Sequence, residues 1–515
     1  MTMAYPLTPS ARRTGRLVLV ATLAVYALTT GGSMATDVMS YEVTRAMVEE
    51  RSVAMSGKVL NLDAHRGVDG RYYSPYGLAH PLYSVPFYLA GRFAEVQLGF
   101  GVGRSEAVRK AAFVMGSAVA AALTVWMTFL FAFRLSGHGR ASVTVAFALA
   151  FGTLLWPYAK YGFNAPLAAL TVAGGVYATW TAMRTGRDGL LVVAGACFGA
   201  AMLVRFELAL AAIVAGLWAA AESQLAPRRV LRVFMLMAAP FGVAVAVMLA
   251  YNAARFGNIW DSGYLRDAGA TFNTSDRVWE GFAGLLVSPG RSFFLYSPVA
   301  IAGVVALAGW FKRDRSTALL LSGVPITLFA FYASLLYWDA DRSYGPRYLL
   351  PLLPFVVLPL VSWVAEPARA ARPERLLDFT RARVLSWLIA ISVLVQIPGI
   401  AMDFTKAGPA LGVSHPLLER RWNWRVSGLV TNTRAAVHFA PDNVRYVFGA
   451  ADPPPVRPPE GRDTGFSEQF GYSFDFWWLY LFYFGKFSRL TMFAVAAGLA
   501  GVAALAIRGI RTRSS

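Results

Sequence analysis

The chain has 515 residues, of which 56% are hydrophobic and only 15% charged, and its net charge is +19. It is too long for one soluble domain and too apolar to be several of them. The basic residues lie in short clusters between long apolar runs, which is typical of a polytopic membrane protein rather than of a nucleic-acid-binding protein. The single cysteine, Cys197, excludes a disulfide framework and a cysteine-based metal site.

Apolar runs of about 20 residues predict membrane-spanning helices. We therefore expect an all-α integral membrane protein, a bundle of about 12 transmembrane helices with interfacial helices in its extracytoplasmic loops. The run 17–35 could pass for a signal peptide, but its length and the many later runs favour a retained first helix. Arg205 and Glu207 divide the range 189–221, which could be one broken span or two. The predicted spans are 17–35, 111–133, 141–158, 165–183, 189–204, 206–221, 231–251, 296–311, 317–337, 348–365, 384–402 and 490–507.

Charge asymmetry predicts the orientation. With a cytoplasmic N-terminus, the cytoplasmic loops hold 21 of the 48 basic residues and six of the 29 acidic ones, a net charge of +15. The other side holds 27 basic and 23 acidic residues, a net charge of +4. Because positive charge in short loops stays inside, we expect both termini in the cytoplasm of a multi-pass inner-membrane protein.

The long connections then lie outside, where we expect the chemistry. We expect a transmembrane module over 1–402, with outer loops at 36–110 and 252–295. An extracytoplasmic segment follows over 403–489, and a last helix with a cytoplasmic tail over 490–515. In the first outer loop, Ser40–Val53 is amphipathic and Pro81–Phe93 is too short to span, which suggests two interfacial helices.

Asp37 stands at the outer end of the first predicted helix. A carboxylate at a membrane surface can accept a proton from a hydroxyl, so Asp37 is a candidate general base. Aspartate is also a common N-cap of a following helix, and position alone favours that second interpretation.

Two further places concentrate charge near the outer membrane face. The loop Trp338–Arg347 contains two carboxylates, Asp339 and Asp341, and two guanidiniums, Arg342 and Arg347. Arginine binds phosphate through two parallel hydrogen bonds, so this loop suits an anionic lipid headgroup, although it could equally be a self-neutralised surface loop. Arg205 is deeply placed, and an intramembrane charge is either functional or held in an ion pair with a residue such as Glu207.

Taken together, the segments resemble the GT-C superfamily of polytopic glycosyltransferases, in particular dolichyl-phosphate-mannose protein mannosyltransferases and bacterial lipid-carrier-dependent sugar transferases. The match covers most of the chain, and it depends on the order of its pieces more than on any one of them. The pieces are Asp37; Asp69-Gly-Arg-Tyr-Tyr-Ser-Pro-Tyr-Gly-Leu-Ala-His-Pro81; Trp156-Pro-Tyr-Ala-Lys160; Arg255-Phe-Gly with Ser262-Gly-Tyr264; Ser288-Pro-Gly290 with Tyr296-Ser-Pro298; and Ser343-Tyr-Gly-Pro-Arg-Tyr-Leu-Leu-Pro351.

The resemblance implies transfer of a sugar from a polyprenyl phosphate outside the membrane, with inversion at the anomeric carbon. Asp37 matches the catalytic aspartate and would be the general base. Arg205, Arg347 and Arg342 become candidates to hold the donor phosphate. The chain departs from the pattern at Phe163-Asn164-Ala165-Pro166, where relatives often carry an acidic residue. Further substrate-site candidates in or near the matching segments are Tyr76, His80, Lys160, Asp339, Asp341 and Tyr344.

The expected partners are a polyprenyl-phosphate sugar donor, a glycan, protein or lipid acceptor, and membrane lipids, with no nucleic acid. No metal-ligand spacing is evident, so we expect no cofactor; a divalent cation, if used, would be sought at Asp339 and Asp341. Two other classes remain open: a transporter or flippase of lipid-linked sugars, and a non-catalytic subunit of an envelope-assembly complex. The long outer loops favour the enzyme.

Overall fold

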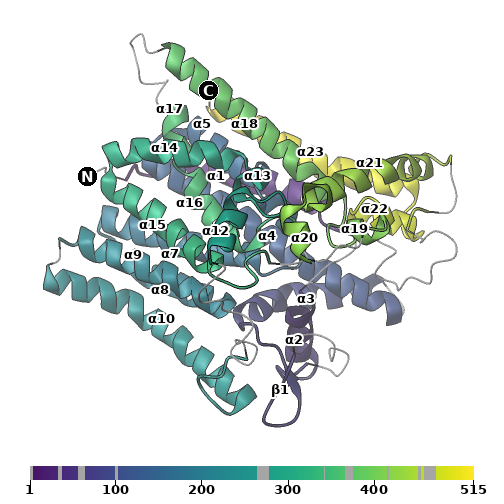
Figure 1. The fold of residues 1–515 in the computed structure, drawn as a ribbon, viewed down its shortest axis with the longest axis horizontal. Helices are drawn as coiled ribbons and strands as arrows, with labels where there is room; N and C mark the ends of the chain where they lie inside the picture. The colour runs from purple at the N-terminus through teal and green to yellow at the C-terminus, as the bar shows by residue number, and fades with distance from the viewer. Residues whose placement is uncertain are drawn as a thin grey trace.

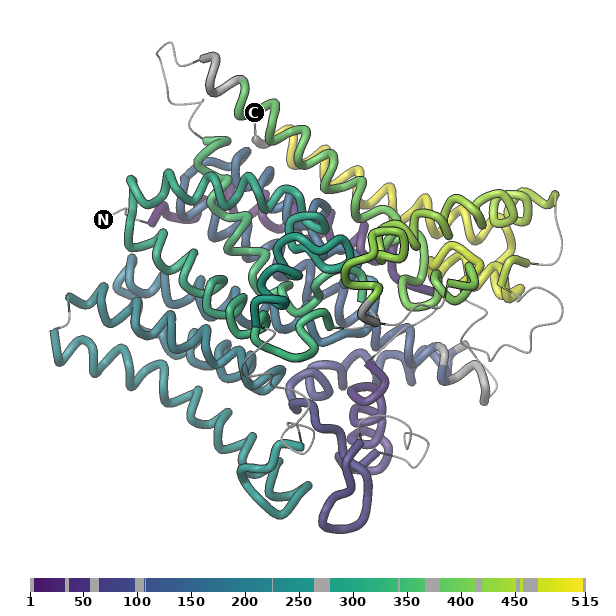
Figure 2. Tube along the Cα trace, viewed as in Figure 1, coloured from purple at the N-terminus to yellow at the C-terminus, as the bar shows by residue number. Residues whose placement is uncertain are grey.

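The computed structural model describes residues 4–32, 37–55, 64–98, 102–224, 226–263, 278–340, 343–365, 375–413, 417–450, 454–456 and 471–514. These parts form a bundle of long helices whose connections are short at one end and long at the other (Figures 1 and 2). The sheet structure in them is one antiparallel hairpin, β1 (His65–Arg66) paired with β2 (Tyr72–Tyr73). The predicted all-α class is therefore confirmed for the described residues.

The first half of the bundle is built around one long helix, α4. It packs against α1, α5 and α7, while α8 packs against α7 and α10. The contact face of α4 is rich in alanine, and such small side chains let helix backbones approach closely. The helices are α1 (Pro9–Leu28), α4 (Val102–Ser136), α5 (Gly139–Phe151), α7 (Ala165–Thr185), α8 (Gly189–Val204), α9 (Ala209–Glu222) and α10 (Pro227–Phe256).

The second half completes the bundle, and its last helix returns to pack along α1. The segment 347–365 is irregular, because it contains Pro351, Pro354 and Pro359 and consists of a 3-10 turn and two short helices. The elements are α12 (Val278–Val287), α13 (Phe293–Tyr296), α14 (Val299–Arg313), α15 (Arg315–Ala333), η4 (Arg347–Leu352), α16 (Leu353–Val357), α17 (Leu360–Ala365), α18 (Arg375–Ala401) and α23 (Arg489–Ser514).

Further helices, most of them short, lie in the connections between the bundle helices. In Figure 1, α2 and the β-hairpin project from the lower side of the bundle, and α21 and α22 extend to the right. The two helices expected in the first outer loop are present as α2 and α3. These elements are α2 (Val38–Glu49), α3 (Ala79–Leu98), α6 (Leu155–Ala159), η2 (Phe206–Leu208), α19 (Ala407–Ala410), α20 (Leu417–Trp422), η5 (Trp424–Val426), α21 (Gly428–Val447) and α22 (Trp477–Tyr483).

Every predicted span coincides with a helix or a run of helices in the described residues. Six of these are long and apolar enough to cross a membrane, by length and composition. The count of twelve crossings stays a prediction. The first helix begins eight residues before the predicted run, because Thr8 caps it and Pro9 fits the first turn. It ends at Leu28, before Gly31 and Gly32.

The range 189–221 forms two helices rather than one. The backbone of Arg205 is extended, with φ −150° and ψ 122°, so α8 ends there. The 3-10 turn η2 then leads into α9, which packs mainly against α15, α10 and α7. This break places the Arg205 side chain at the end of the bundle that carries the long connections.

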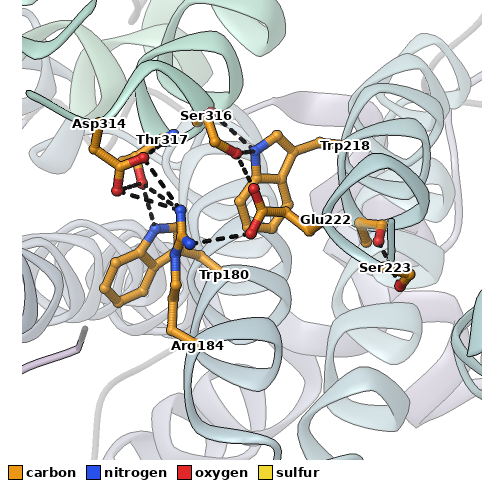
Figure 3. A network of polar contacts seen from close by, with 9 residues as sticks. Trp180, Arg184, Trp218, Glu222, Ser223, Asp314, Ser316 and Thr317 are labelled. Carbon is orange, nitrogen blue, oxygen red and sulfur yellow. Dashed lines mark hydrogen bonds and ion pairs between the residues drawn. The ribbon is translucent and has the colours of Figure 1, made fainter. Parts of the chain in front are cut away.

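A buried charge network lies at the opposite end of the bundle (Figure 3). The Arg184 guanidinium, at the end of α7, contacts Glu222 at 3.0 Å and Asp314 at 3.2 Å, and all three side chains are at most 9% exposed. Trp180 and Trp218 add indole hydrogen bonds to Thr317 and Ser316. The network joins α7, α9 and α15 and keeps each buried charge paired.

Candidate functional site

Three consecutive residues at the outer end of α7 bring the main candidates together. The Asp37 backbone N–H donates to the carbonyl of Gly162 at 3.1 Å. The guanidinium of Arg347 lies 5.3 Å from the ring centre of Phe163. Arg205 donates to the side chain of Asn164. Residues far apart in sequence thus converge on one turn, 162–164.

Asp37 is the N-cap of α2. Its carboxylate accepts from the Ser40 backbone N–H at 3.3 Å and from the Ser40 hydroxyl at 2.8 Å. The capping interpretation is therefore confirmed. A carboxylate can accept about four hydrogen bonds, so capping leaves lone pairs that could receive a proton. Asp37 is half-buried, and both roles are compatible with this position.

Arg205 lies in the break between α8 and η2, where it is 8% exposed. Its Nε and Nη2 both donate to Oδ1 of Asn164, at 3.1 Å and 2.6 Å. The guanidinium also lies 5.2 Å from the ring centre of Tyr348. Glu207, two residues later, accepts from the hydroxyl of Tyr332 at 3.0 Å.

Arg347 begins η4 and shares the Tyr348 ring with Arg205. Its guanidinium lies 5.6 Å from that ring centre. The two like charges repel each other, which an anion bound between them would relieve. The buried Nε of Arg347 has no hydrogen-bond partner among the described residues. Cation–π contacts with Phe163 and Tyr348 hold the guanidinium without using its N–H groups, which leaves the Nε–H as a donor for an anion.

The segment before α3 lies beside Arg205 and Arg347. Gly77 packs directly on the end of α8, because a Cβ there would lie 2.0 Å from the Leu203 carbonyl oxygen. Tyr76, next to it, lies near enough to Arg347 to interact electrostatically. We call Asp37, His80, Arg205 and Arg347 the outer cluster.

His80 is 4% exposed, and its Nδ1 has no hydrogen-bond partner among the described residues. Burial lowers the pKa of its imidazole to about 4; the Asp37 carboxylate acts in the opposite direction, and the Arg205 guanidinium adds to the lowering. The imidazole is therefore neutral at pH 7, and it interacts electrostatically with both Asp37 and Arg205.

The candidate Lys160 belongs to a different contact. Its ammonium is 1% exposed and pairs with Asp475 at 2.9 Å. It also donates to the carbonyls of Ile400 and Met402. Tyr161 donates to the same carboxylate at 3.0 Å. This buried pair ties the end of α6 to the segment before α22, and it does not join the outer cluster.

Two residues of the loop 338–347 also have other partners. Asp339 is 1% exposed, and both of its oxygens accept from Arg421, at 3.0 Å and 3.1 Å. Tyr344 is fully buried, where its hydroxyl donates to the carbonyl of Val395. Asp341 and Arg342 lie outside the described residues.

The described residues contain no group of three His, Cys, Asp or Glu side chains that could hold a metal ion. A cation was to be sought at Asp339 and Asp341. The Asp339 carboxylate accepts from the Arg421 guanidinium, and Asp341 lies outside the described residues. A carboxylate held by two N–H donors is a poor start for a hard-cation site, which needs several free oxygens.

Sequence reasoning missed the residues that hold the two arginines. Phe163 and Tyr348 stand in segments that the sequence analysis quotes, but nothing in the sequence shows that their rings contact the arginines. Asn164 did carry a signal, because it stands where the related pattern has an acidic residue. That signal was interpreted as a departure from the pattern and not as a contact of Arg205.

No known protein family matches the sequence, and no curated protein sequence matches it. Solved structures resemble the fold. A crystal structure of ArnT from Cupriavidus metallidurans bound to undecaprenyl phosphate is 14% identical, with a TM-score of 0.43 over 89% of this chain and 84% of that one. The same protein in its apo state is 13% identical, with a TM-score of 0.46 over 90% and 84% of the two chains. The archaeal oligosaccharyltransferase AglB from Archaeoglobus fulgidus, in complex with an inhibitory peptide and a dolichol-phosphate, is 12% identical, with a TM-score of 0.42 over 90% and 64%.

Proposed function

We propose that this chain is an inverting glycosyltransferase that moves a sugar from a polyprenyl phosphate to an acceptor hydroxyl on the extracytoplasmic side of the membrane. The observation that carries the proposal is that the Asp37 backbone and the guanidiniums of Arg205 and Arg347 all contact the turn 162–164. The Asp37 carboxylate and the Arg205 guanidinium also both act electrostatically on His80. Asp37 and Arg347 stand in the ordered motifs that resemble the GT-C superfamily, and Arg205 is a candidate from its deep position in the predicted spans.

The chemistry needs few groups. The acceptor oxygen attacks the anomeric carbon, and the bond from that carbon to the phosphate oxygen breaks. Asp37 takes the hydroxyl proton, and the polyprenyl phosphate leaves with the bonding electrons. Attack from the face opposite the leaving group inverts the anomeric centre. The reaction consumes no other reactant, because the phosphate already activates the sugar.

The two arginines have the role of stabilising the leaving group. Negative charge grows on the phosphate as its bond to the sugar breaks, and fixed cations aimed at that charge lower the barrier. Stacking on Tyr348 fixes both guanidiniums before the donor arrives. A preorganised site of this kind avoids a cost of reorganisation during the reaction.

Asp37→Asn tests the proposal. Asparagine is as good an N-cap as aspartate, so α2 should form normally and the donor should still bind. Transfer should fall by about two to four orders of magnitude, because the base is gone. The measurement is turnover of purified protein with a panel of labelled polyprenyl-phosphate sugars.

The matched control is Asp442→Asn, which removes an exposed carboxylate from α21 and should leave turnover unchanged. Near-wild-type transfer by Asp37→Asn would remove the general-base role. No detectable transfer by the wild-type protein across the whole panel would favour a transporter or an assembly subunit instead.

A further inference from the structure

Asn164 occupies the N-cap position of α7 but does not cap the helix. Asparagine is among the best N-cap residues, and its side-chain oxygen normally accepts from the first turn. Here that oxygen accepts from Nε and Nη2 of Arg205. The orientation of the amide is settled by its partner, because arginine only donates.

The neutral acceptor keeps an additional negative charge out of a site that already contains the Asp37 carboxylate and has Glu207 beside Arg205. An amide oxygen can fix two N–H groups of a guanidinium without adding a negative charge beside it. A carboxylate of the same shape would hold the same fork more strongly and would cancel the charge. The Arg347 guanidinium lies over the same ring as Arg205, so the two cations together form an electropositive pocket edge.

We propose that Asn164 is a positioning residue that orients Arg205 while keeping the outer cluster cationic, and so sets the preference for a lipid phosphate over a neutral lipid alcohol. The inference rests on the proposed function, since it concerns the donor phosphate of the same site. It assigns a role to a residue that touches Arg205 and not the reacting atoms.

Asn164→Asp tests the inference in the full-length purified protein. The probes are geranylgeranyl phosphate and geranylgeraniol, which share one chain and differ in charge. Wild type should bind the phosphate more tightly than the alcohol. In Asn164→Asp the affinity for the phosphate should fall at least tenfold at pH 7.5, while the affinity for the alcohol should not change.

Asn164→Ala separates positioning and charge from simple structural damage. It removes the acceptor but adds no negative charge, so Arg205 is loosened and remains a cation. Phosphate affinity should therefore fall less than in Asn164→Asp. A merely structural role predicts the reverse order, because aspartate preserves the side-chain shape and alanine does not.

Asn252→Asp is the matched control. Oδ1 of Asn252 accepts from Nη2 of Arg255 at 2.8 Å, so the same substitution is made beside another buried arginine. It should leave the affinity for geranylgeranyl phosphate unchanged. Wild-type phosphate affinity in Asn164→Asp, or a larger loss in Asn164→Ala, would overturn the inference.

These binding measurements are independent of sugar transfer. Loss of phosphate preference in Asn164→Asp together with normal transfer by Asp37→Asn would support the inference and refute the general base. No binding of geranylgeranyl phosphate by wild type would overturn the donor site and, with it, the role of Asn164.

Discussion

The outer cluster depends on how single side chains are held. Arg347 is fixed by stacking on Phe163 and Tyr348 and not by hydrogen bonds to described residues. A planar guanidinium suits this setting, because its faces pack on rings while its N–H edge points elsewhere. Lysine has neither the plane nor the paired donors.

We expect Arg347→Lys to weaken binding of a lipid phosphate although the charge is kept. Loss of one charge-assisted hydrogen bond costs roughly 1.5–3 kcal/mol, or about 10- to 150-fold in affinity. The measurement is the dissociation constant for geranylgeranyl phosphate. Arg232→Lys, at the other end of the bundle, is the control and should bind as wild type does. Equal affinity in wild type and Arg347→Ala would exclude Arg347 from the site.

His80 gives the cluster an acid-sensitive element. Its pKa is about 4 in the folded chain against 6.5 ordinarily, chiefly because it is buried. Between pH 6.5 and 4 the imidazole of His80 is protonated in the unfolded chain but stays neutral in the folded chain. The free energy of unfolding is therefore highest above pH 6.5 and decreases as the pH falls toward 4. A depression of the pKa of this size corresponds to about 3 kcal/mol of folding free energy.

We therefore expect the apparent melting temperature in detergent to fall between pH 7 and 4.5, and to fall less in His80→Gln. Glutamine fills similar space but cannot be protonated in this range. His438→Gln changes an exposed histidine on α21, and its melting temperature should fall with pH as much as that of the wild type. An unchanged pH dependence in His80→Gln would mean that other groups cause the acid sensitivity.

Buried ion pairs join the helices at one end of the bundle. The network around Arg184 pairs three charges inside the bundle, and Figure 3 shows the guanidinium lying between Asp314 and Glu222. Removing one partner of a buried group of charges leaves the others uncompensated, which costs about 3–5 kcal/mol.

Arg184→Ala should therefore lower stability strongly while leaving the distant outer cluster assembled in the protein that does fold. Arg232→Ala is the control, because Arg232 pairs with Asp188 at 2.7 Å on the surface and such pairs contribute about 1 kcal/mol or less. Melting curves of both variants give the comparison. Equal losses would show that burial does not distinguish the two ion pairs.

The lengths of the apolar runs predicted the helices well, because a helix that crosses a membrane needs about 20 consecutive apolar residues. The charges at Arg205 and Glu207 also marked the break between α8 and α9. The sequence did not show the partners of Arg205, because Asn164 and Tyr348 lie in other elements.

The sequence named candidate site residues but did not show their contacts. Asp37, Arg205 and Arg347 all contact the turn 162–164. Asp37 and Arg347 stand in the quoted motifs, whereas Arg205 was a candidate because of its position within the predicted spans. Lys160 was also a reasonable candidate, being a cation beside an apolar run. Its partner Asp475 lies in the segment before α22, and a single sequence gives no sign of so distant a pairing.

At the scale of the whole molecule, the outer cluster and the Arg184 network lie at opposite ends of the helix bundle. Helices α7 and α15 connect them, since α7 begins at the turn beside Arg205 and ends at Arg184. The end with short connections is the one that sequence analysis assigned to the cytoplasm from its net charge of +15. The end with long connections carries the outer cluster.

The topology follows as a prediction that decides on which side of the membrane the proposed chemistry occurs. Val68 is 68% exposed between β1 and β2, and Arg187 is exposed between α7 and α8. In a Cys197→Ser background, Val68→Cys should react in intact cells with a membrane-impermeant maleimide, and Arg187→Cys should react only after the cells are lysed. Positive charge in short loops resists translocation, which is the reason for this expectation. Labelling of Arg187→Cys, but not of Val68→Cys, in intact cells would reverse the orientation and place Asp37 in the cytoplasm, where the proposed transfer could not reach an extracytoplasmic acceptor.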